Sequence, residues 1–155
     1  MTASYWKRGL LAVRVVQLKI PGRLPPPLVH KLGPTWALAL SADGKFLASG
    51  HNDHWIVIWD MATKKVHKKI QVPGGRIYSI AFSPDSRHVA SSTGKRTVHE
   101  RELATGKPTL DIELQKDNGN VFAIAYSAKL GLVAASYEGH TRILRRKRSL
   151  KVQKM

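Results

Sequence analysis

The chain has 155 residues, enough for one domain with a buried core, and its 43% hydrophobic content is ordinary for a globular protein. It contains no cysteine, which excludes disulfides and cysteine-ligated metals and favours a reducing compartment, the nucleus or the cytoplasm. No run of 18 apolar residues occurs, so the sequence predicts no membrane-spanning helix.

The formal net charge of +16 is concentrated at the two ends of the chain. Residues 1–42 hold six Lys or Arg and no acid, and residues 139–155 hold seven and no acid. All ten acids lie between Asp43 and Glu138, where 13 basic residues nearly balance them. Two basic ends indicate an acidic partner, most simply a nucleic acid such as RNA.

Residues 1–34 form a basic extension followed by a proline-rich linker, and the extension allows two interpretations. Its Arg-bearing, acid-free start is typical of a mitochondrial targeting segment. Alternatively, the β-branched residues of Val13–Ile20 predict one further strand for the fold that follows. Pro21-Gly22 and Pro25-Pro26-Pro27 then predict a stiff connector, because proline cannot join a central ladder.

The stretch from Trp36 to Asp60 organises the rest of the chain. Two short apolar runs flank a turn that contains Asp43-Gly44, a strong hairpin signal. A third run, Trp55–Trp59, is rich in aromatic and β-branched residues and follows a polar turn. These features predict three antiparallel strands in a meander.

The same pattern recurs along the sequence. Residues 77–86 repeat the first strand and its turn after 42 residues, and residues 121–127 repeat the strand after a further 44. A period in the forties that is made of short strands is typical of a β-propeller.

At this point the chain resembles the WD-repeat (WD40) β-propeller family, from about Thr35 to Ile143. The residues that carry the resemblance are Phe82-Ser83-Pro84-Asp85, Leu47–Gly50 and Ile56–Asp60. The segments Gly33–Trp36 and Asp43–Gly50 are similar to the branch of the family that supplies a WD-repeat subunit to the Ski and Paf complexes. The resemblance implies an all-β fold, a partial and degenerate propeller of about three blades, and a non-catalytic scaffold for protein partners in a larger complex.

We expect the blades to occupy residues 35–144 and a basic tail to occupy residues 145–155. In the second repeat, Glu100-Arg101-Glu102 stands where the first has Ile58-Trp59-Asp60, so we expect that strand to lose its regularity. Propellers close with roughly four to eight blades, and three blades leave two open ends. The chain would then be part of a larger assembly, an oligomer, or a truncated propeller with no independent role.

The resemblance also implies a buried hydrogen-bond network in each complete blade. Its positions in the first repeat are Ser49, Asp53 and Trp59, with His30 a candidate for the histidine. The second and third repeats lack the aspartate and the tryptophan. Buried polar groups of this kind are tolerated only when they pair with one another.

Three aromatic residues, Trp36, Tyr78 and Phe122, occupy the same position in the three repeats. In WD-repeat propellers this position lies near the mouth of the central channel, where partners often bind. Exposed aromatics are also favoured in interface hot spots. We therefore predict that these residues contact a protein partner; the alternative is that they pack between blades.

The cluster Arg145-Arg146-Lys147-Arg148 is a candidate nucleic-acid contact or nuclear import signal, and a solvated tail is the alternative.

No nucleophile motif, paired carboxylate or phosphate-binding loop is recognisable, so we expect no enzyme, no small-molecule substrate and no cofactor. His51, Asp53 and His54 share one short turn, where histidines three apart do not converge, and a zinc site needs a further ligand. We therefore expect no metal site.

Overall fold

The computed structural model describes residues 27–29, 32–113, 120–127, 132–137 and 140–145, which form antiparallel strands without a helix. The strands form three separate sheets, each built as a meander of consecutive strands. The expected all-β fold of antiparallel blades is confirmed. The strands are β1 (Thr35–Leu40), β2 (Phe46–His51), β3 (Trp55–Asp60), β4 (Lys65–Gln71), β5 (Ile77–Phe82), β6 (His88–Thr93), β7 (Thr97–Glu102), β8 (Pro108–Glu113), β9 (Val121–Tyr126), β10 (Leu132–Tyr137) and β11 (His140–Arg145).

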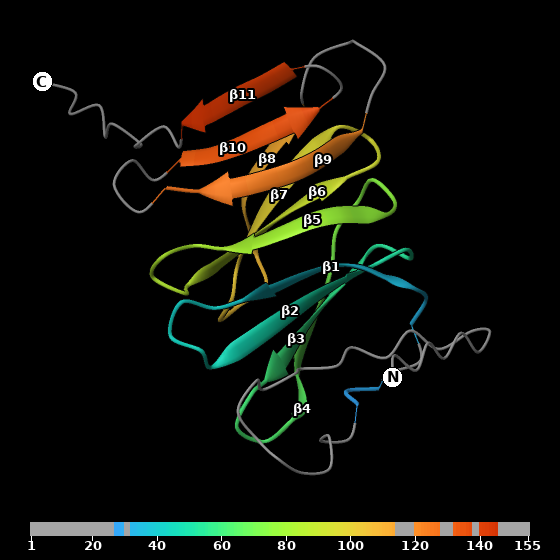
Figure 1. Cartoon of the computed structure of the whole chain (residues 1–155), viewed down its shortest axis with the longest axis vertical. Helices are drawn as coiled ribbons and strands as arrows, with labels where there is room; N and C mark the ends of the chain where they lie inside the picture. Colours follow the sequence, from blue (N-terminus) through green and yellow to red (C-terminus); the bar gives the residue numbers. More distant parts are fainter. Residues whose placement is uncertain (1–26, 30–31, 114–119, 128–131, 138–139, 146–155) are drawn as a thin grey trace, which may run out of the picture.

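We call the three sheets blade one (β1–β4), blade two (β5–β8) and blade three (β9–β11). Figure 1 shows the blades stacked face to face, with the first strands β1, β5 and β9 side by side along one side of the stack. Each blade therefore contributes its first strand to a shared surface, and residues at equivalent positions of these strands become neighbours in space.

The turn between the first two strands has the same side-chain chemistry in blades one and two. In blade one, the Asp43 carboxylate accepts hydrogen bonds from the Ser41 hydroxyl (2.7 Å) and the Lys45 backbone N–H (3.1 Å). In blade two, Asp85 accepts from the Ser83 hydroxyl (2.5 Å) and the Arg87 backbone N–H (3.0 Å). A short polar side chain that bonds the backbone two residues on fixes such a turn, so the repeated Ser-x-Asp sets the same hairpin twice.

The main core lies between blades one and two. Both facing surfaces supply aliphatic side chains, and blade two adds the aromatic ring of Phe82. The buried members are Ala37, Ala48, Ile56, Ile58, Ile70, Val72, Ile77, Ile80, Phe82, Val89 and Leu103. A smaller cluster of Ala90, Val98, Val121 and Ile124 joins blades two and three. Burial of apolar area is the dominant favourable term in folding, so the cluster between blades one and two is a main source of stability among the described residues.

Gly50 on β2 allows blade two to approach this closely. A methyl group added there would lie 2.5 Å from Ile77 Cγ2 and 2.8 Å from Ile80 Cδ1. Both side chains are buried, so neither can move away freely. The backbone of Gly50 thus forms part of the floor on which blade two packs.

The face of blade one that points away from blade two is only partly covered. Leu28 packs there on Leu47, Val57 and Trp59. On β1, Leu38 and Leu40 remain 51% and 57% exposed, whereas their counterparts in blade two, Ile80 and Phe82, are buried beneath blade one. Among the described residues no sheet lies over Leu38 and Leu40.

One expectation from the sequence is wrong. Strand β7, in which Glu100-Arg101-Glu102 replaces an apolar sequence, is regular and pairs with β6 and β8. His99, Glu100 and Arg101 are buried there. The strand tolerates these residues because each charged group finds polar partners, as described below.

Candidate partner-binding site

A β-bulge places the three predicted partner-binding aromatics. In β1 the register with β2 shifts between Thr35 and Ala37, which leaves Trp36 out of the ladder. Tyr78 is left out in the same way between β5 and β6, and Phe122 between β9 and β10. A bulge bends the strand and re-aims the side chain of the extra residue. The three repeats therefore present an aromatic side chain with the same local geometry.

The stacking of the blades brings these side chains into one line. The rings of Tyr78 and Phe122 lie edge to face, with their centroids 5.4 Å apart. Between Trp36 and Tyr78 lies the guanidinium of Arg76, 4.2 Å from the Trp36 ring centroid and 5.8 Å from that of Tyr78. We call Trp36, Arg76, Tyr78 and Phe122 the aromatic row.

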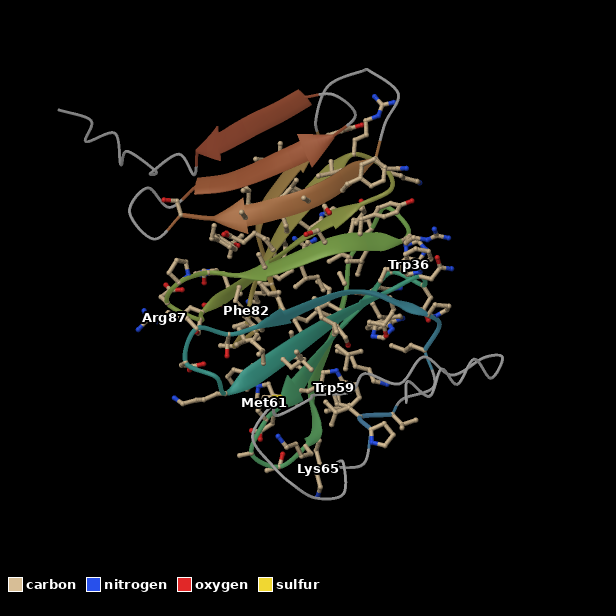
Figure 2. The ribbon with its side chains drawn as sticks, viewed as in Figure 1. Trp36, Trp59, Met61, Lys65, Phe82 and Arg87 are labelled. Carbon is tan, nitrogen blue, oxygen red and sulfur yellow. The ribbon has the colours of Figure 1, made fainter. Side chains whose placement is uncertain are left out.

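The aromatic row lies at one edge of the stack and is accessible to solvent. Trp36 is 51% exposed and Phe122 48% exposed, while Tyr78 in the middle is half-buried. Figure 2 shows Trp36 at this edge and Arg87 at the opposite edge. Tyr78 lies between the Arg76 guanidinium and the Phe122 ring, so the row combines packing between blades with exposure to solvent.

Arg76 was not singled out by the sequence analysis, yet it completes the row. Its Nε donates a hydrogen bond of 2.6 Å to the side-chain oxygen of Asn52, in the β2–β3 turn of blade one. Its carbonyl oxygen accepts from the backbone N–H of Gly94, in the β6–β7 turn of blade two. The equivalent positions in the other repeats are Pro34 and Asn120. The repeat pattern therefore gave no signal for an arginine at this place in the row.

A second cluster, inside blade one, contains the predicted structural residues Ser49 and Trp59. The Trp59 indole N–H donates to the Ser49 hydroxyl oxygen at 2.9 Å. The same hydroxyl lies 2.9 Å from His51 Nε2, and His51 Nδ1 lies 3.0 Å from the carbonyl oxygen of Gly33. One consistent assignment is that the Ser49 hydroxyl donates to Nε2 and that Nδ1–H donates to Gly33. We call this chain of bonds the tryptophan network.

The histidine of the tryptophan network is His51, which the sequence analysis considered only as a metal ligand. The candidate His30 lies outside the described residues. His51 is 2% exposed, and its burial lowers the pKa of the imidazole, although the Gly33 hydrogen bond and the nearby Asp53 carboxylate oppose that shift. Asp53 accepts a long bond of 3.4 Å from the Gly33 backbone N–H and is not hydrogen-bonded to Trp59 or Ser49 in the described contacts.

Blade two holds a charged cluster at the matching position. Arg101 replaces Trp59, and its Nη1 donates to the Asp111 carboxylate at 2.5 Å. His99 Nδ1 lies 2.8 Å from the same carboxylate oxygen. Burial raises the pKa of Asp111, but the hydrogen bonds and charges of Arg101 and His99 outweigh it and lower the pKa below 3.8. We call Arg101, Asp111 and His99 the arginine network.

On the other face of β7, Glu100 joins blades two and three. It accepts hydrogen bonds from the Tyr126 hydroxyl (2.7 Å) on β9 and from the Thr109 hydroxyl (2.6 Å) on β8. Its carboxyl group is thus surrounded by donors at a position where blade one has Ile58. Buried polar groups cost little stability when they are satisfied in this way.

The remaining predicted sites are placed only in part. Arg145 ends β11, while Arg146, Lys147 and Arg148 lie outside the described residues. Within the described ranges no three His, Asp or Glu side chains gather in a way that could hold a metal ion. No helix in the described part of the chain is long and apolar enough to cross a membrane.

Repeated antiparallel sheets that share a turn, a bulge and a stacking geometry define the blades of a β-propeller-type repeat protein. Comparison with known families agrees with this class. Residues 28–60 and 64–99 match the model of the "WD domain, G-beta repeat". These two segments are therefore WD40 repeats, and proteins built from such repeats typically serve as protein-interaction scaffolds and are generally non-catalytic.

Among curated proteins, superkiller complex protein 8 of Dictyostelium discoideum is 29% identical over 57% of this chain and 31% of its own length. WD repeat-containing protein SL1-17 of Schistosoma mansoni is 28% identical over 68% of this chain and 34% of its own. The U5 small nuclear ribonucleoprotein 40 kDa protein of Mus musculus is 29% identical over 41% of this chain and 18% of its own. The chain spans about a third of the length of the first two relatives.

Proposed function

We propose that this chain is a non-catalytic WD40 scaffold that holds a protein partner within a larger complex, and that the aromatic row is its contact surface. The observation that carries the proposal is the bulge that presents Trp36, Tyr78 and Phe122 from three successive repeats. Large exposed apolar side chains that gather on one edge are characteristic of protein interfaces, and Trp, Tyr and Arg are the residues most enriched in hot spots.

Two further findings support the proposal. The names of two relatives, superkiller complex protein 8 and the U5 small nuclear ribonucleoprotein 40 kDa protein, describe them as components of complexes. In addition, two of the row's aromatic side chains remain about half exposed despite their size. Burial of such rings against a partner would supply a large part of the binding free energy.

The test compares the aromatic row with an exposed apolar residue outside it. The double variant Trp36→Ala/Phe122→Ala removes the two exposed rings, and Leu40→Ala removes an equally exposed apolar side chain at the other end of the strand. Quantitative affinity purification should show that the double variant loses its stable protein partners and that Leu40→Ala keeps them. Retention of the same partners by the double variant would contradict the proposal.

A second candidate function, contact with RNA phosphates through the basic ends, is favoured by the charge distribution of the sequence. Engagement of about four tail cations would make log K fall with log salt at a slope near −3, since each contact to a single strand contributes about −0.7. Deletion of residues 145–155 should weaken binding to all RNAs about equally and flatten this slope. An unchanged slope after the deletion would remove this candidate.

A further inference from the structure

Arg76 is held in place as an unpaired cation within the aromatic row. Its guanidinium lies against the ring of Trp36, and its Nε is fixed by the hydrogen bond to Asn52. Among the described residues no acid forms an ion pair with it, and no hydrogen bond is formed by its two terminal Nη groups. The fork of terminal N–H donors therefore remains available at a partly exposed site.

The turns around Arg76 are also basic. The backbone N–H of Gly75 donates to His54, which places the β2–β3 turn of blade one next to the Arg76 segment. The β6–β7 turn of blade two, which carries Lys95 and Arg96, is joined to Arg76 through the N–H of Gly94. The nearest acid in these turns, Asp53, accepts a bond from the Gly33 backbone. An anionic ligand would thus meet several positive charges here and one negative charge.

On the basis of the proposed function, we infer that the aromatic row recognises a short acidic segment of a protein partner, with one carboxylate seated on the Arg76 fork and apolar side chains against Trp36, Tyr78 and Phe122. A planar guanidinium pairs with a carboxylate through two parallel N–H···O bonds, and Asn52 and Trp36 already hold the guanidinium in one orientation. Such preorganisation reduces the entropic cost of binding.

The geometry favours a peptide over single-stranded nucleic acid. Nucleic-acid platforms stack bases on open aromatic faces. Here one face of Trp36 is occupied by the guanidinium, and Tyr78 and Phe122 contact each other edge to face. The rings therefore offer edges and partial faces, which suit aliphatic or aromatic side chains better than a run of stacked bases.

The experiment measures binding of the full chain to a labelled peptide that alternates Glu with Leu and Phe, beside the same peptide with Gln for Glu and an oligouridylate of equal charge. Arg76→Gln removes the fork, Arg76→Lys keeps the charge without it, and Arg87→Gln makes the same charge change at the opposite edge. We expect Arg76→Gln and Arg76→Lys to weaken binding of the Glu peptide about tenfold or more, and Arg87→Gln to change it less than about twofold.

The inference is overturned if the Gln peptide binds as well as the Glu peptide, if both arginine positions behave alike, or if oligouridylate binds the row more tightly than the peptide. In the first of these cases, loss of peptide binding in Trp36→Ala/Phe122→Ala would show that the row still binds protein without using Arg76 for charge recognition. If that double variant binds normally as well, the proposed function of the row fails together with the inference.

Discussion

Blades one and two solve the same packing problem with different chemistry. In blade one, the indole of Trp59 fills the sheet face and donates to Ser49, and the chain of bonds continues through buried His51. In blade two, Arg101 occupies the equivalent position and pairs with Asp111. The backbone strands are equally regular in both. The comparison shows that this strand position accepts either an indole or a guanidinium when the buried N–H groups find a partner within the same blade.

The two networks differ in how much stability each should contribute. The tryptophan network buries a large apolar surface together with one satisfied donor, so it gains from both terms. The arginine network removes a guanidinium from water and pairs it with Asp111, which is 45% exposed, so desolvation cancels much of the attraction. We therefore expect blade one to be the more sensitive of the two to substitution at this position.

The largest effect is expected for Trp59→Ala. Truncation of a buried aromatic costs roughly 3–5 kcal/mol of unfolding free energy, and it also leaves the Ser49–His51 pair without its donor. Chemical denaturation followed by circular dichroism would measure the loss. Trp55→Ala, on the same strand but less buried, is the matched control and should cost clearly less. Equal losses for the two variants would argue against the tryptophan network.

Gly50→Ala should have the next largest effect, because the added methyl group would collide with Ile77 and Ile80. Overpacking of this kind costs typically about 1–3 kcal/mol. The equivalent residue in blade two is Ser92, which is buried and already carries a Cβ, so Ser92→Ala should be close to neutral. Thermal melts of both variants would compare the two interfaces. A Gly50→Ala variant as stable as the wild type would indicate that the blades are packed less closely.

Arg101→Met should have a smaller effect than either. Methionine keeps most of the side-chain length and removes the buried charge. The partner left behind, Asp111, is 45% exposed and can be hydrated, so the substitution does not leave a fully buried unpaired charge. We expect a change of about 1 kcal/mol or less in unfolding free energy. Asp111 would then lose its main cationic partner, so its pKa should rise, which NMR titration can follow. If Arg101→Met costs as much as Trp59→Ala, the contrast between the blades is wrong.

The smallest expected effect is the change of folding stability with pH. It distinguishes the two networks because His51 and Asp111 titrate in different pH ranges. Burial lowers the pKa of His51 in the folded protein below 6.5, so the unfolded chain binds more protons and stability falls as the pH drops below about 6.5. Asp111 has a pKa below 3.8 in the folded protein, so its contribution is present above about pH 4 and is lost only in stronger acid. Melting temperatures between pH 7.5 and 5.5 should fall for wild type and for His67→Gln, and less for His51→Gln. An identical fall in all three would exclude His51 as the titrating group.

The sequence predicted the features that depend on local pattern. The period of 42 and 44 residues, the repeated turn after the first strand and the equivalent positions of Trp36, Tyr78 and Phe122 all follow from residue spacing, which a meander of strands converts directly into position. Features that depend on side-chain contacts between strands or between repeats were missed. Arg76 became visible only when Asn52 and Trp36 of the preceding blade were beside it. Strand β7 was misjudged because Asp111, Thr109 and Tyr126, which satisfy its charges, come from other strands.

The edge carrying the aromatic row is proposed to hold a protein partner. The most direct measurement is photo-crosslinking in cells with p-benzoylphenylalanine placed at Phe122, in the row, or at exposed Arg87, at the opposite edge. We predict that the probe at Phe122 gives a discrete crosslink to a protein and that Arg76→Gln in the same chain weakens it, whereas the probe at Arg87 gives none. A crosslink that forms at Arg87 and not at Phe122 would contradict the claim.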